Sequence, residues 1–138
     1  MIRMKKFLMI LAAALPMLLP LSASAQTGEG ADVFQPIAKY IRTADAESLS
    51  AWFADNLEVT VLSSTSVASR NQAKQIVKSF FEAFAPRSFE VTSTASRGNT
   101  RHAIGTLRAG GEVFGVTILV SCKEKSYHIR QLKFEKAD

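Results

Sequence analysis

The stretch from Ser88 to Glu135 constrains the fold of this chain more than any other segment. Its β-forming residues are interrupted at Gly98-Asn99, Gly110-Gly111 and Glu124-Lys125, and short breaks of this kind are typical of hairpins. We therefore expect four consecutive antiparallel strands, over residues 88–96, 100–109, 112–123 and 126–135. A meander of this size needs other elements to cover one of its faces.

Two-residue turns at Gly110-Gly111 and Glu124-Lys125 predict the register of the meander. They place Gly105 opposite Val116 and Cys122 opposite Tyr127, so that alternate side chains share a face. One face is predicted to be the core: Ala103, Gly105, Leu107, Phe114, Val116, Ile118, Val120, Cys122, Tyr127 and Ile129. The opposite, outer face carries His102, Ile104, Thr106, Arg108, Val113, Gly115, Thr117, Leu119, Ser121, His128 and Arg130.

Two irregularities are expected in these strands. Phe89 and Val91 join the core face only if the turn at residues 97–99 has three residues, with a bulge at Gly98 or Asn99. The apolar phase also changes after Ile129, which predicts a bulge near Arg130-Gln131.

A helix is predicted directly before the meander. Ser69 and Gln72 have the spacing of a capping box, and Pro86 ends the segment. The apolar positions between them recur at helical spacing: Ala73, Ile76, Val77, Phe80, Phe81 and Phe84.

Two further helices and one strand are expected upstream. Asp32 is a good N-cap for the first helix, and Asp45 for a shorter second helix whose apolar face extends to Phe53. Residues 56–62 alternate between apolar and polar side chains and predict a half-buried strand.

Residues 1–25 have the pattern of a secretory signal peptide. A basic start precedes the apolar run Phe7–Leu21, and small residues then lead to an expected cleavage between Ala25 and Gln26. The apolar run is too short to span a bilayer, so no stable membrane anchor is expected. We expect a periplasmic or secreted protein with a flexible lead-in at 26–31 and a single domain at 32–138.

Cleavage would also lower the net charge of the protein. It removes three basic residues and leaves 14 basic against 12 acidic ones, a net charge of +2. A nucleic-acid partner is not expected at this charge, since nucleic-acid domains carry a concentrated basic face. Cys122 is the only cysteine, which excludes an intramolecular disulfide.

The predicted order of helix, helix, strand, helix and four-stranded meander resembles the nuclear transport factor 2-like (cystatin-like) fold. This α+β fold wraps a curved antiparallel sheet around three helices as a cone. Gly105 and Gly115, in mid-strand, favour such a bend. Several stretches resemble the exported bacterial family known as domain of unknown function 4783: Phe34-Gln35-Pro36-Ile37, Asp45-Ala46-Glu47-Ser48-Leu49-Ser50 with Phe53, Gln72-Ala73, Phe80-Phe81, Ile104-Gly105-Thr106-Leu107 and Ile129-Arg130-Gln131-Leu132-Lys133-Phe134-Glu135. This resemblance implies the fold and export, and it carries over no activity or functional residue.

The predicted core face offers no catalytic acid or base, so we assign no catalytic residue, metal site or cofactor. Arg101, Cys122 and Tyr127 are expected to meet at one open end of the cone as a pocket mouth. A homodimer interface is expected on the outer face, where an apolar patch is rimmed by histidine and arginine. Its predicted residues are His102, Ile104, Val113, Leu119, His128 and Arg130.

Two functions remain open. The first is a non-catalytic module that binds a small apolar ligand or a protein partner. The second is an enzyme of the isomerase or dehydratase type, acting on a small apolar substrate inside the cone. An enzyme needs a general acid or base in the cavity, and the first strand offers only Asp55 and Glu58 for that role.

The signal peptide generates the first testable prediction. The full-length chain, expressed with its own leader, should yield an exported species whose mass begins at Gln26, with or without loss of ammonia to pyroglutamate. Intact-mass measurement of the periplasmic fraction checks this. An exported species that retains Met1, or a protein that partitions with washed membranes, would contradict the prediction.

Overall fold

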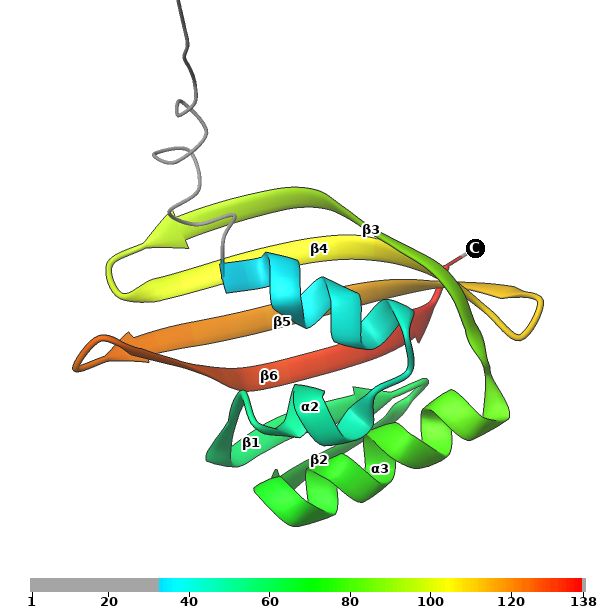
Figure 1. Cartoon of the computed structure of the whole chain (residues 1–138), viewed down its shortest axis with the longest axis horizontal. Coiled ribbons are helices and arrows are strands. Elements are labelled where there is room, and N and C mark those ends of the chain that lie inside the picture. The colour runs from blue at the N-terminus through cyan, green and yellow to red at the C-terminus, as the bar shows by residue number, and fades with distance from the viewer. Residues whose placement is uncertain (1–32, 138) are drawn as a thin grey trace, which may run out of the picture.

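The computed structural model describes residues 33–137, and the predicted signal peptide, its cleavage site and the lead-in lie outside this range. No helix of the described part is both long and apolar enough to cross a membrane. The fold is α+β, with one curved six-stranded sheet in the order β2-β1-β6-β5-β4-β3 (Figure 1). The elements are a helix at 33–42, α2 (Ala46–Ser50), β1 (Phe53–Val61), β2 (Ser64–Ser69), α3 (Arg70–Ala83), β3 (Pro86–Arg97), β4 (Thr100–Ala109), β5 (Glu112–Lys123) and β6 (Ser126–Lys136).

The helices lie on one side of the sheet, with α3 beside β1 and β2 and the helix at 33–42 across the meander (Figure 1). The predicted capping box of α3 is confirmed, because the Ser69 hydroxyl accepts the Gln72 N–H while the Gln72 side chain accepts the Ser69 N–H. Phe80 attaches α3 to the sheet. Its ring stacks on Phe134 with 4.5 Å between centroids and meets Phe114 edge-on at 5.1 Å.

The start of α2 is capped as expected. The Asp45 carboxylate accepts the backbone N–H of Ser48 at 3.0 Å. This hydrogen bond from the Ser48 backbone lowers the pKa of Asp45 below its usual value, and a hydrogen bond from the Ser48 side chain lowers it further by a smaller amount.

The register of the meander is confirmed. Gly105 pairs with Val116 and Cys122 with Tyr127, on the two predicted two-residue turns. The bulge in β6 is also confirmed, since the ladder with β5 shifts at Arg130. The predicted core and outer faces therefore alternate as expected.

The turn between β3 and β4 differs from the prediction. Arg97 pairs with Thr100, so this turn has two residues instead of three. The bulge lies inside β3 at Thr92, where the pairing shifts between Val91 and Ser93. The bulge shifts the alternation of side chains in β3 by one residue, as the three-residue turn was expected to do. Phe89 and Val91 therefore face the core.

The strand count and the strand directions also need correction. The predicted sheet had one first strand plus the meander and was antiparallel throughout, whereas the observed sheet includes β2 and pairs β1 parallel to β6. β2 was missed because it buries a single apolar side chain, Ala68, among serines and a threonine. β1 starts at Phe53, a residue that was assigned to the second helix.

Gly105 permits a close contact in the sheet. A Cβ at this position would lie 2.7 Å from the ring of Phe89 and 2.6 Å from the Glu90 carbonyl oxygen. Phe89 therefore lies directly against the backbone of β4. At Gly115 the nearest atom to such a Cβ is 4.0 Å away.

The aromatic contact of α3 generates a stability prediction. Phe80→Ala should lower the free energy of unfolding by about 3–4 kcal/mol, since it opens a cavity among four other phenylalanine rings. Lys78→Ala, at an exposed position on the same helix, is the control and should change it by less than about 0.5 kcal/mol. Chemical denaturation measures both free energies of unfolding. Similar decreases for the two variants would mean that another face of the helix packs against the sheet.

The two glycines make a second matched pair. Gly105→Ala should cost about 1–3 kcal/mol, because its methyl group overlaps both the Glu90 carbonyl oxygen and the Phe89 ring. Gly115→Ala should be neutral or stabilising by up to about 1 kcal/mol, since it restricts the unfolded chain and meets no neighbour. Equal effects in urea denaturation would refute the close packing of Phe89 on β4.

Candidate functional site

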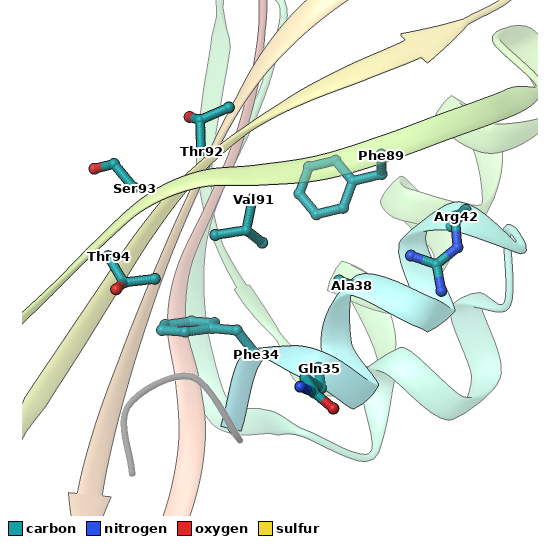
Figure 2. A pocket seen from close by; sticks show the side chains of 9 residues that line it. All are labelled: Phe34, Gln35, Ala38, Arg42, Phe89, Val91, Thr92, Ser93 and Thr94. Carbon is teal, nitrogen blue, oxygen red and sulfur yellow. The ribbon is translucent and has the colours of Figure 1, made fainter. Parts of the chain in front are cut away.

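A pocket of about 630 Å³ lies between the helix at 33–42 and β3. Figure 2 shows its side chains: Phe34, near the start of the helix, faces Val91 across the pocket, and Arg42 lies at the opposite end of the helix. The lining residues are Phe34, Gln35, Ala38 and Arg42 from the helix, and Phe89, Val91, Thr92, Ser93 and Thr94 from β3.

The inner part of the pocket is apolar. Phe34 and Phe89 are 2% and 4% exposed, Ala38 is buried and Val91 is half-buried. The polar side chains of Gln35 and Arg42 lie at exposed positions of the helix. The pocket thus has an apolar floor and a polar rim, the usual arrangement of a small-molecule site.

The bulge in β3 shapes the opposite wall. Thr92 is the extra residue, and its hydroxyl donates a hydrogen bond to the carbonyl oxygen of Ile104 on β4 at 3.0 Å. This bond holds the bulge against the sheet. Beyond it, residues 92–94 are exposed. Ser93 pairs with Ile104 on the outer face, whereas Thr94 pairs with Ala103 on the core face, so that the Thr94 hydroxyl is the one on the pocket side.

The pocket lining has a single ionisable side chain, that of Arg42. A guanidinium stays protonated at every physiological pH and cannot serve as a general base. Asp55 and Glu58, the two acids considered for catalysis, lie elsewhere. Asp55 is 92% exposed in an ion pair with Arg70, and Glu58 follows the buried Leu57 and precedes the buried Val59, so it faces outward. This arrangement can bind a ligand, and its lining supplies no proton acceptor.

The three residues predicted as a pocket mouth lie together on the inner face, as their register requires. Cys122 pairs with Tyr127, and Arg101 pairs with Val120 next to them. The Arg101 guanidinium donates to the carbonyl oxygens of Gly98 and Thr100 at 3.1 and 3.3 Å. None of the three lines the pocket at β3.

The two histidines lie on the outer face in different surroundings. His102 pairs with Leu119, whereas His128 pairs with Ser121. His128 and Arg130 line a shallow polar hollow of about 320 Å³ at the start of β1. Its other lining residues are Ala54, Asp55, Asn56, Arg70, Ser121 and Lys123. Residues 33–137 contain no group of three histidine, cysteine or acidic side chains placed to hold a metal ion.

The apolar patch of the outer face is only partly exposed. Ile104 is 41% exposed, while Val113 and Leu119 are half-buried among their neighbours. The homodimer through this face stays a prediction.

The pocket at β3 was not predicted from the sequence. Of its floor residues, Phe89 is predicted only as a core position and Phe34 only as part of a stretch that resembles the family, and the bulge observed at Thr92 is predicted in the following turn. The one local signal was Gly105, whose missing side chain leaves room for Phe89.

Comparison with solved structures places this fold among proteins of two groups. A DUF4783 family protein from Bacteroides uniformis has a TM-score of 0.71 at 20% identity, over 74% of this chain and 94% of its own. One from Bacteroides ovatus has a TM-score of 0.72 at 18% identity, over 75% and 94%. An NTF2-like protein of unknown function from Shewanella baltica has a TM-score of 0.60 at 7% identity, over 86% and 99%.

No curated protein matches this chain. The family model described as Domain of unknown function (DUF4783) matches residues 34–135, which include the pocket and all six strands except Lys136, the last residue of β6. The chain therefore belongs to the DUF4783 family and has an NTF2-like fold.

Proposed function

We propose that this protein is exported and binds a small amphipathic ligand, without transforming it, in the pocket between the helix at 33–42 and β3. The observation that carries the proposal is the lining itself: an apolar floor, a polar rim and one permanent cation. Export is supported by the basic, apolar and small-residue pattern of residues 1–25.

The apolar floor favours a hydrophobic ligand body. Phe34 and Phe89 come from different elements and are both nearly fully buried, so their side chains form a fixed part of this floor. A volume of about 630 Å³ lies within the usual range for small-molecule pockets, about 300–1,000 Å³.

Arg42 favours an anionic group on that body. None of the ion pairs among residues 33–137 involves Arg42, so its guanidinium is available to a carboxylate, sulfonate or phosphate. Hydrogen bonds to a charged partner are about twice as strong as neutral ones. The hydroxyl group of Thr94, which pairs with Ala103 on the core face, adds a further donor on the opposite side of the rim.

The enzyme alternative lacks a suitable acid or base. Catalysis of proton transfer requires a group within hydrogen-bond reach of the reacting atom. Asp55 pairs with Arg70 in solvent, and Glu58 faces away from the core. Binding without chemistry is therefore the function that the pocket supports best.

A fluorescent pair of probes tests the proposal. The anion 8-anilinonaphthalene-1-sulfonate and the uncharged N-phenyl-1-naphthylamine share an aromatic body and differ in charge. Arg42→Gln should weaken binding of the sulfonate about tenfold and leave the uncharged probe nearly unchanged. Thr94→Trp should weaken both, because it fills the pocket. Fluorescence titration of the protein made from the full-length chain measures the dissociation constants.

Arg108→Gln is the matched control, since Arg108 is an exposed arginine on the outer face of β4. It should bind both probes as the unchanged protein does. Binding that is insensitive to both Arg42→Gln and Thr94→Trp would place the probes elsewhere and refute the proposed site.

A further inference from the structure

The two edge strands of the sheet differ in how they are protected. β3, at one edge, carries devices that discourage pairing with another chain. Pro86 lacks an N–H, Thr92 forms a bulge, and Arg87, Glu90 and Arg97 add charge. Strand addition at this edge is therefore disfavoured.

β2, at the opposite edge, has none of these devices. Its sequence Ser-Thr-Ser-Val-Ala-Ser contains neither a proline nor a charged residue, and its ladder with β1 is regular from end to end. Residues 64–67 are exposed, and Val67 is 78% exposed. A regular neutral edge of this kind is a template for a further strand.

The hairpin geometry shows which backbone groups of β2 are open. The Leu62 N–H donates to Phe134 of β6 at 2.7 Å, so the neighbouring Val61 directs its N–H to β2. Val61 and Ser64 flank the two-residue turn and pair directly, which makes them a hydrogen-bonded pair. By alternation, the N–H and C=O groups of Thr65 and Val67 point away from β1, toward the open edge.

A groove of about 450 Å³ runs alongside this edge. Its lining is neutral and combines apolar side chains with amides: Ser66, Val67, Ala68, Asn71, Gln72, Gln75 and Ile76. The residues from α3 are those on the flank next to β2. The edge and its flanking helix thus form one continuous uncharged strip.

We propose that β2 pairs antiparallel with β2 of a second copy of this chain, joining the two sheets into one across a two-fold axis. Near such an axis each side chain approaches its own counterpart, so any charge would oppose a like charge. The strip avoids that cost because it carries no charge. Its amides, which both donate and accept, are self-complementary. This interface is separate from the pocket at β3 and does not depend on the proposed ligand.

Amide hydrogen exchange on the protein made from the full-length chain tests the proposal at residue resolution. The amides of Thr65 and Val67 should exchange at least tenfold more slowly at about 500 µM than at about 5 µM. The amides of Ser66 and Ala68, which bond to β1, should be protected at both concentrations. An exchange rate of Thr65 and Val67 that does not depend on concentration would overturn the proposal.

Two lysine variants at exposed apolar positions separate this interface from the outer face. Val67→Lys should weaken dimerisation at least tenfold in sedimentation equilibrium. Ile104 belongs to the competing outer-face interface expected from the sequence, and if the copies pair through β2 instead, Ile104→Lys should leave dimerisation unchanged. Circular dichroism should show that both variants are folded. A wild type that is monomeric at 500 µM overturns the proposal, as does a dimer that Ile104→Lys dissociates and Val67→Lys does not, or one that neither variant affects.

Discussion

The contact of Phe80 with Phe114 and Phe134 is the interaction on which the rest of the structure depends. It joins α3, in the middle of the chain, to the strands β5 and β6 near its end. Rings stacked or edge-on at about 5 Å gain more than their buried area alone provides. Because β6 also pairs with β1, the same contact fixes the first strand and its hairpin partner β2 under α3.

The charged contacts of α3 add orientation to this apolar anchor. Arg70 pairs with Asp55 of β1, and Lys74 pairs with Glu47 of α2 at 3.2 Å. The acidic side chains are more than four-fifths exposed, so each pair contributes little to stability. They nevertheless leave the flank of α3 next to β2 free of charge, which is the property that the proposed self-pairing uses.

Local sequence patterns predicted most of the fold because most strands of the sheet pair with the strand next to them in the sequence. Each hairpin of the meander is joined by a short turn, so turn residues and alternation were enough to set the register of Gly105 and Cys122. The parallel pairing of β1 with β6 joins strands far apart in the chain, and no turn encodes it. β2 follows a turn at Leu62, a residue that adopts a positive φ without being glycine, so its local sequence gave no sign of a hairpin.

The candidate site was harder to predict for the same reason. The confirmed register places Arg101, Cys122 and Tyr127 on one face of neighbouring strands, and their role as a pocket mouth stays a prediction. The pocket instead needs the packing of the helix at 33–42 against β3 and a bulge at Thr92. One extra residue brings Phe89 to the core face whether it lies within the strand or in the turn that follows. The apolar character of Phe89 alone therefore does not show which of the two positions holds the bulge.

The two proposals use opposite edges of one sheet, and this separation has a consequence. Six strands about 4.8 Å apart separate β2 from β3 by about 24 Å along the curved sheet, so a second copy paired at β2 leaves the pocket at β3 open. In such a dimer the two pockets lie at the far ends of the joined sheet. Coupling between sites requires an element with two arrangements that both ligands bias. The rings around Phe80 are packed at 4.5–6.0 Å between centroids, and a close-packed core resists continuous deformation, so we expect the two binding sites to act independently.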